Sequence, residues 1–323
     1  MAMTMIKTKT IQVLLAAYNG AEFLNEQINS VLLNFDKLSG FDCQLLISDD
    51  KSSDDTSSIL SDYSEKDSRV RFLDGNRKGG VKDNFNFLIM AATADYIFFC
   101  DQDDLWLPNK ISIFISKFNE VETSDLPILL HSDLCVSDKN LSPINVSMFA
   151  YQKINKDPTF SDLIVSNSVT GCVMAINKSL LTIVQGCNVS KSIMHDWYIA
   201  LIASAFGKIH FIPSALILYR QHGNNQVGAK SFSIKDGLNK NIFEKSLKSL
   251  TSTKKQAEIF LADFDIDISD SHRCALESYI GSFNKSFFNR LHLFITGRVR
   301  KYGYTRNIMF LLMYVFFCGK KIR

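Results

Sequence analysis

Residues 96–106 read Tyr96-Ile97-Phe98-Phe99-Cys100-Asp101-Gln102-Asp103-Asp104-Leu105-Trp106. The apolar half of this stretch has the length of a buried strand, and it ends in three carboxylates within four residues. Carboxylates at this density repel one another, and burying them without partners costs on the order of several kcal/mol each. The cluster therefore either faces open solvent or holds a cation. Because open α/β sheets bind ligands beyond the carboxyl ends of their strands, we expect a cation.

The residues before this stretch alternate between strand and helix patterns. Buried strands are predicted over Thr10–Ala17, Gln44–Ser48 and Val70–Leu73, and the helices between them over Glu22–Phe35, from Ser52 to Tyr63, and over Asn84–Ala92. This alternation with short connections indicates a parallel sheet with right-handed crossovers. The carboxyl ends of parallel strands lie on one edge, so Asp49 and Asp101 are expected to belong to one site.

The residues after Pro108 continue a mixed α/β pattern and then become helical. We predict a helix over Lys110–Glu120, a strand over Ile128–His131, a helix over Pro158–Asn167, a strand over Gly171–Ile176, a helix from His195 to Ala205, and strands over Ile209–Ile212 and Leu216–Tyr219. From residue 231 the chain is polar, rich in Lys, and predicted to be helical. The sequence thus divides into a main domain (1–230, with halves 1–107 and 108–230) and a C-terminal extension (231–323).

Positive charge is concentrated at the C-terminal end. Gly281–Arg323 holds nine Lys and Arg and no Asp or Glu, whereas the preceding residues carry 27 basic against 33 acidic groups. Aromatic residues alternate with the basic ones, as in segments that lie at a membrane surface. Packing of these residues on the core is the alternative. The net negative charge of the residues before Gly281, and the absence of a recognisable nucleic-acid-binding motif, argue against nucleic acid as a partner.

The seven cysteines are scattered and contain no CxxC pair, which argues against a disulfide framework and against a structural zinc site. This usage is typical of a reducing cytoplasm. No stretch has the roughly 18 apolar residues of a membrane span. We therefore expect a cytoplasmic protein, with a peripheral position on the cytoplasmic face of the inner membrane if the tail binds lipid.

Several polar groups qualify as site residues. Asp101 and Asp103 can supply carboxylates to Mg²⁺ or Mn²⁺, while Asp104 is expected to cap the next helix. Asp49 can accept hydrogen bonds from a base or a sugar, although a plain capped loop is as compatible with its sequence context. Asn76–Gly80 lacks both the P-loop pattern and the dinucleotide pattern.

Two later motifs carry candidates for proton transfer and ligand contact. Asp196 lies between His195 and Trp197, where apolar bulk can raise a carboxyl pKa toward that of a useful base. An N-cap aspartate is the structural alternative. His222 stands in a polar loop, either as a phosphate or metal contact or in a surface turn.

Taken in order, these segments resemble the inverting nucleotide-sugar glycosyltransferases of family 2, which have the GT-A fold, over residues 10–225. The matching pieces are the strand and turn ending in Tyr18-Asn19-Gly20, the loop Asp49–Thr56, the DxD motif Asp101-Gln102-Asp103, Thr170-Gly171-Cys172, and His195-Asp196-Trp197. Lys51 and Asp55 replace the two usual glycines of the second motif. The combination with Tyr219-Arg220-Gln221-His222-Gly223 is most similar to the rhamnosyltransferase branch, which builds bacterial O-antigen and capsule polysaccharides.

The resemblance implies a role for each motif. The donor nucleotide would contact Ala17, Tyr18, Asn19, Asp49, Asp101 and Gln102. Mg²⁺ or Mn²⁺ would be held by Asp103, Asp101 and His222. Asp196 would be the catalytic base, and Gly171, Cys172, His195 and Trp197 would lie on the acceptor side.

The favoured reaction is inverting transfer of L-rhamnose from dTDP-rhamnose to a lipid-linked glycan. A UDP-hexose transferase of the same fold and a catalytically silent nucleotide- or glycan-binding protein are the alternatives. A nucleotidyltransferase is disfavoured because no glycine-rich basic loop follows the first strand.

Overall fold

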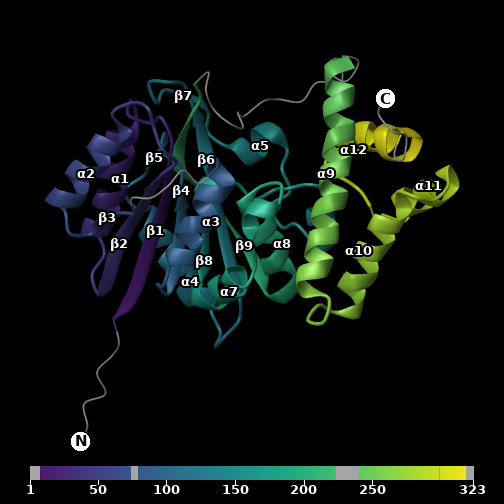
Figure 1. Cartoon of the computed structure of the whole chain (residues 1–323), viewed down its shortest axis with the longest axis horizontal. Coiled ribbons are helices and arrows are strands. Elements are labelled where there is room, and N and C mark those ends of the chain that lie inside the picture. Colours follow the sequence, from purple (N-terminus) through teal and green to yellow (C-terminus); the bar gives the residue numbers. More distant parts are fainter. Residues whose placement is uncertain (1–7, 74–78, 223–239, 298, 318–323) are drawn as a thin grey trace, which may run out of the picture.

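The computed structural model describes residues 8–73, 79–222, 240–297 and 299–317, and Figure 1 shows their arrangement. The N-terminal half contains the elements β1 (Lys9–Ala17), α1 (Leu24–Asp36), β2 (Phe41–Asp49), α2 (Thr56–Lys66), β3 (Val70–Phe72), α3 (Val81–Ala91), β4 (Tyr96–Cys100), β5 (Leu105–Trp106) and α4 (Lys110–Val121). Strand and helix alternate here as the sequence predicts. The strand expected at residues 96–100 is β4, and all five of its residues are buried.

The second half adds antiparallel strands and the C-terminal helices. Its elements are β6 (Ile128–Ser137), β7 (Pro143–Asn145), α5 (Met148–Gln152), α6 (Phe160–Val165), a 3-10 turn (Gly171–Val173), β8 (Met174–Asn177), α7 (Lys178–Gln185), a second 3-10 turn (Val189–Lys191), α8 (His195–Phe206), β9 (Lys208–Arg220), α9 (Lys240–Phe264), α10 (Asp270–Ser282), α11 (Phe287–Ile295), α12 (Tyr304–Leu311) and a π-helical segment (Leu312–Phe317).

One mixed sheet organises the molecule, with strand order β3-β2-β1-β4-β8-β6-β9-β5 and β7 paired to β6. The strands β3, β2, β1 and β4 are parallel, which confirms the prediction for the N-terminal half. β8 runs antiparallel to both β4 and β6, and it turns the sheet from a parallel into a mixed one. The register pairs Ala17 with Asp49 and Leu15 with Cys100. The ends of β1, β2 and β4 therefore meet at one edge.

Alternating residues of the central strands supply two hydrophobic layers. Val13 and Leu15 of β1 face the layer covered by α1 and α4, while Leu14 faces the layer covered by α3, α7 and α8. Both layers are closed to solvent, so the sheet is rigid where its strands end. The polar loops at that edge are thus held by a fixed frame.

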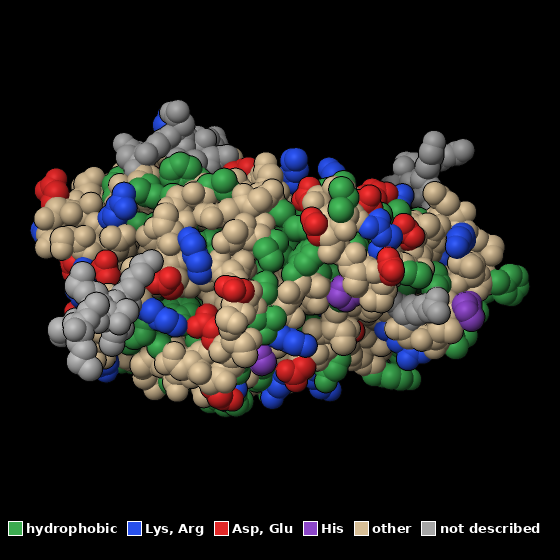
Figure 2. Space-filling model, turned by 90° about the horizontal axis from the view of Figure 1, so that it is seen from below, with side chains coloured by type: hydrophobic (Ala, Val, Ile, Leu, Met, Phe, Trp, Pro, Cys, Tyr) green, Lys and Arg blue, Asp and Glu red, His purple; other side chains and the backbone are tan. Residues whose placement is uncertain are grey.

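The helices of the C-terminal extension pack on the α8 side of the sheet. α9 stands between the sheet and the helices α10–α12 (Figure 1), and its Phe260 and Phe264 belong to the same buried cluster as α6 and α8. Tyr314 and Phe310 from the tail are buried in that cluster too. Other tail side chains stay in solvent, among them Phe288 at 78% and Tyr304 at 82% exposure. Figure 2 shows hydrophobic side chains protruding at this end of the molecule.

Three local expectations differ from the structure. The strands predicted over 209–212 and 216–219 form one continuous strand, β9. The segment at Gly171–Val173 is a 3-10 turn that precedes the strand. Asp104 does not cap α4, whose N-cap residue is Asn109. Among the described residues no helix is long and apolar enough to cross a membrane.

Candidate functional site

The loop after β1 is tied directly to the DxD motif. The amide of Gln102 accepts a hydrogen bond from the Tyr18 N–H (2.7 Å) and donates one to the Tyr18 carbonyl (2.9 Å). A Cβ on Gly20 would lie 2.4 Å from the Gln102 side-chain oxygen, so a side chain at position 20 would displace the Gln102 amide from Tyr18. Tyr18 is 49% exposed beside this junction. Its ring is therefore available to a ligand at the strand ends.

The loop after β2 is closed by its own hydroxyl groups. The Asp49 carboxylate accepts hydrogen bonds from the Ser52 N–H and from the hydroxyls of Ser52 and Ser57, and it is only 6% exposed. Lys51 has a φ of 64°, the left-handed conformation for which glycine is usually required. Asn19 joins this loop to the first one, because its side-chain oxygen accepts the Ser53 N–H at 2.8 Å.

Asp50 has a role that sequence reasoning missed. Its two carboxylate oxygens accept the backbone N–H groups of Gly79 (3.0 Å) and Gly80 (2.7 Å), both of which have positive φ. Asp50 thereby fixes the start of α3 against the end of β2. The neighbouring residues Asn76–Lys78 lie outside the described part of the chain.

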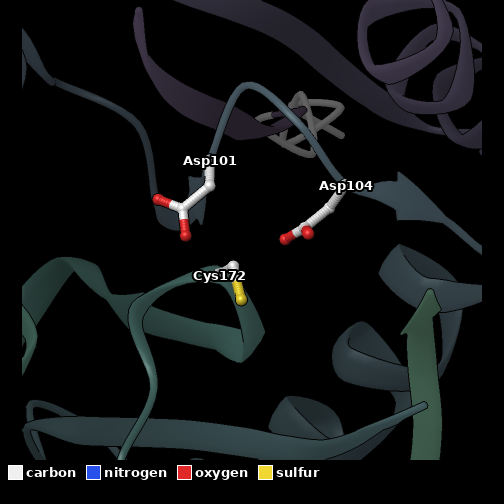
Figure 3. Close-up of side chains that lie close together, drawn as sticks. All are labelled: Asp101, Asp104 and Cys172. Atoms are coloured by element: carbon white, nitrogen blue, oxygen red, sulfur yellow. The ribbon is translucent and has the colours of Figure 1, made fainter. Parts of the chain in front are cut away.

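The carboxylates after β4 have two sets of partners. Asp101 and Asp104 converge with Cys172, and their ligand atoms lie within 4.8 Å of one another (Figure 3). The Asp103 carboxylate lies 2.7 Å from the His222 Nε2. Asp104 is buried and accepts the Arg220 N–H at 3.1 Å. It supports the end of β9, which explains why it does not cap the next helix.

Burial and mutual repulsion perturb these acids. Burial, together with the charges of Asp103 and Asp196, raises the pKa of Asp101 to about 7. Burial and the charges of Asp103 and Asp101 raise the pKa of Asp104 well above its usual range. Cys172, which lies beside Asp101 and Asp104, directly follows Gly171, whose N–H donates to Asp196 at 3.1 Å, so the acid of α8 is close to the DxD motif. The two sequence motifs thus converge on one site.

A buried lysine lies beneath the acidic cluster. Lys110 is fully buried at the start of α4, donates to the Cys172 carbonyl at 2.7 Å, and has its ammonium 3.4 Å from the Trp106 ring centre. Burial lowers the pKa of Lys110 to about 8, although the neighbouring acids oppose this. It is a positive charge within reach of Asp101 and Asp104. Sequence reasoning missed it because its helix shows only an ordinary amphipathic pattern.

Asp196 lies in the first turn of α8, and the N-cap residue is Met194. Its carboxylate accepts the N–H of Gly171 at 3.1 Å and that of Trp197 at 2.7 Å. Burial raises the pKa of Asp196 to about 6, while these N–H groups and the Asn167 side chain lower it. A carboxylate of this kind is ionised at neutral pH and yet basic enough to accept a proton.

The residues on either side of Asp196 pack against neighbouring elements. His195 is buried with its ring stacked on Phe85 at 3.9 Å between centroids, and burial lowers its pKa to about 3. It is neutral and serves as a wall. A Cβ on Gly171 would lie 3.1 Å from the His195 Nε2, so the turn fits tightly against that ring. The Trp197 indole N–H donates to the Leu163 carbonyl at 2.6 Å and fixes α8 to α6.

Comparison with known proteins identifies the family. The model of "Glycosyl transferase family 2" matches residues 12–182, just over half of the chain. The chain belongs to glycosyltransferase family 2. A dTDP-rhamnosyl transferase of Shigella flexneri is 29% identical over 242 residues, covering 68% of this chain and 76% of the relative. A GalNAc(5)-diNAcBac-PP-undecaprenol beta-1,3-glucosyltransferase of Campylobacter jejuni is 32% identical over 111 residues, covering 34% and 35%.

Solved structures place this family 2 glycosyltransferase in the GT-A fold. TarS from S. aureus in complex with UDP-GlcNAc aligns with a TM-score of 0.53 at 16% identity, covering 87% of this chain and 80% of that one. A mannosyltransferase from Pyrobaculum calidifontis in complex with GDP-Man and Mn²⁺ aligns with a TM-score of 0.50 at 13% identity, covering 95% and 87%. The fold expected from the sequence is confirmed.

The donor set of the glycosyltransferase fits a hard divalent cation. Mg²⁺ and Mn²⁺ prefer oxygen ligands, which the carboxylates at the end of β4 supply, and Mn²⁺ also accepts imidazole. Burial holds the Cys172 thiol pKa well above its usual range, so the sulfur stays protonated and is a poor ligand. The oxygen ligands that lie together are those of Asp101 and Asp104, while Asp103 and His222 form a separate pair.

Arg220 is a further residue that the sequence reading left without a role. Its guanidinium is 3% exposed and donates to the Asp103 carbonyl at 2.8 Å and to Glu26 at 2.5 Å. It also stacks 4.5 Å from the Phe23 ring centre. These contacts hold the end of β9, and with it His222, against the DxD turn.

Proposed function

We propose that this glycosyltransferase transfers L-rhamnose from dTDP-rhamnose, with inversion, to a hydroxyl of a lipid-linked glycan in cell-surface polysaccharide biosynthesis. The observation that supports the reaction type is the convergence of Asp196 and the DxD motif on the Gly171-Cys172 turn: Asp196 accepts the Gly171 N–H at 3.1 Å, and Cys172 lies beside Asp101 and Asp104. The donor is favoured by the dTDP-rhamnosyl transferase relative. The acceptor class is favoured by relatives whose names include diphosphate-linked undecaprenol.

The donor would bind at the ends of β1, β2 and β4. Tyr18 and Asn19 present one wall, and Asp49 presents an acceptor for the base or the ribose. Asp101, Asp103 and His222 would hold a divalent cation, which when bound stabilises negative charge on the leaving diphosphate. Gln102 keeps the first loop against the DxD turn, so that the walls of this site move together.

Asp196 would accept the proton of the acceptor hydroxyl as its oxygen attacks the anomeric carbon. The bond from that carbon to the diphosphate oxygen breaks at the same time, and its electron pair leaves with dTDP. Attack opposite to the leaving group inverts the anomeric centre. The N–H groups of Gly171 and Trp197 orient the Asp196 carboxylate for this step.

The test is release of nucleoside diphosphate from a panel of donors, with and without Mn²⁺. We expect dTDP release from dTDP-rhamnose in the presence of a lipid-diphosphate-linked acceptor, and loss of release with Asp196→Asn. A UDP-hexose as the preferred donor would replace the rhamnosyl assignment; structural neighbours with bound UDP-GlcNAc or UDP make it the second candidate. Nucleotide binding without release from any pair would favour a silent binding protein.

A further inference from the structure

An open cavity of about 360 Å³ lies between α9 and α12, away from the DxD motif. Its wall combines two kinds of side chain. Basic groups come from Lys245, Lys301 and Arg306, and apolar groups from Leu250, Phe310 and Met313. A cavity of this mixed composition suits a ligand that is anionic at one end and hydrocarbon at the other.

The basic groups of this cavity lack acidic partners. Among the described residues, neither Lys301 nor Arg306 forms an ion pair with a carboxylate. Burial, and then the charge of Arg306, lowers the pKa of Lys301 to about 8. Burial also lowers the pKa of Arg306. Two cations that repel each other in a partly apolar wall are unfavourable until an anion binds between them.

The cavity adjoins the proposed acceptor side of the active site. Ser166 lines the cavity, and the side chain of the next residue, Asn167, is hydrogen-bonded to the backbone of Val169 (2.7 and 2.9 Å). Two residues further on, the Gly171 N–H donates to Asp196 at 3.1 Å. α6, which ends just before Ser166, is also bound to α8 through the Trp197 indole and the Leu163 carbonyl. The short segment from Ser166 to Gly171 therefore connects the cavity to Asp196, the candidate base.

We propose that this cavity binds the diphosphate of a prenyl-linked acceptor, with Lys245, Lys301 and Arg306 on the phosphates and Leu250, Phe310 and Met313 along the first prenyl units. The acceptor sugar then extends past Ser166 toward Asp196. The inference rests on the proposed function, since it names where the acceptor's lipid-diphosphate end is held. It gives the C-terminal helices a part in acceptor binding.

Binding of farnesyl diphosphate to the full chain tests the site directly. The assay contains EDTA, so that a metal-dependent diphosphate site at the DxD motif does not contribute. We expect affinity to fall about tenfold or more in Lys301→Gln and Arg306→Gln, and to be largely kept in Arg306→Lys. Lys245→Gln and Lys248→Gln form a matched pair on α9, both exposed, of which only Lys245 lines the cavity. Lys245→Gln should weaken binding and Lys248→Gln should not.

Two further probes identify the chemistry. Inorganic pyrophosphate and farnesol should each bind more weakly than farnesyl diphosphate, because each lacks one half of the recognised group. Equal binding of farnesol, equal binding of pyrophosphate, or unchanged affinity in Lys245→Gln and Lys301→Gln would overturn the proposal. These binding measurements do not depend on sugar transfer. Absence of nucleoside diphosphate release would therefore refute the proposed function, whereas loss of farnesyl diphosphate binding would refute the cavity proposal. In an active enzyme, Lys301→Gln should raise KM for the acceptor and leave KM for the donor unchanged.

Discussion

At the scale of single residues, Asp196 governs the expected pH dependence. The carboxylate must be ionised to accept a proton, and burial places its pKa at about 6. We expect the rate of transfer to fall about tenfold per pH unit below that value. Asp196→Asn should reduce turnover by a factor of roughly 10² to 10⁴ while nucleotide binding persists. Near-normal turnover of the variant, measured as nucleoside diphosphate release, would remove Asp196 from the reaction.

The same residue makes a prediction about stability. The pKa of Asp196 rises from 3.8 to about 6 on folding, so the folded state keeps its proton in a pH range where the unfolded state has lost it. Stability from this group is present below about pH 4 and is lost as the pH rises to about 6. Relative to Asp196→Asn, the wild type should lose up to about 3 kcal/mol over this range. Urea unfolding of both proteins at several pH values measures the difference, and parallel curves would contradict it.

Sequence reasoning located residues whose chemistry is local and missed those whose role depends on distant partners. The family resemblance grouped Asp103 with His222, and in the structure these two side chains lie 2.7 Å apart. The cap expected of Asp104 was wrong because a short strand separates this residue from the helix. Nothing in the sequence around Arg220 indicates that its guanidinium reaches Glu26.

At the scale of elements, Lys110 ties α4 to the acidic edge. Lys110→Met should lower the free energy of unfolding by roughly 1–3 kcal/mol, because it leaves the buried Cys172 carbonyl without its donor and removes the ammonium from the Trp106 ring. Lys117→Met is the matched control on the same helix, since the one ion pair of Lys117 among the described residues is with the exposed Glu120. Equal effects of the two substitutions would contradict this role.

The strands show why local patterns predict some elements and not others. β4 was predictable because its five apolar residues are mostly aromatic or β-branched and end at the acidic cluster, so the run is too short for a helix. β9 looked like two strands because Pro213 and Ser214 interrupt its pattern. In the structure, Ile212 pairs with Ser132 and Ala215 pairs with Asp133. Pro213 and Ser214 therefore form a bulge within one strand. A bulge accommodates a proline that lacks an N–H, but only the neighbouring strand determines that the chain continues beyond it.

At the scale of the whole molecule, the basic tail combines buried and exposed aromatic residues. Tyr314 and Phe310 belong to the core, whereas Phe288 is 78% and Phe316 49% exposed. The sequence left packing and membrane contact as alternatives. The buried residues establish packing for one face of the tail. The exposed residues, together with an excess of Lys and Arg, leave a second face whose composition suits an anionic lipid surface.

This second face predicts binding to anionic vesicles. Phe288→Ser and Phe316→Ser should each weaken co-sedimentation with phosphatidylglycerol vesicles by roughly five- to tenfold, because each removes an aromatic ring from the interface. Binding should also weaken as salt screens the basic groups. Val146→Ser is the control, since this side chain is 75% exposed on the body near β7 and belongs to no basic tail. If all three variants bind as the wild type does, the exposed rings do not contact lipid.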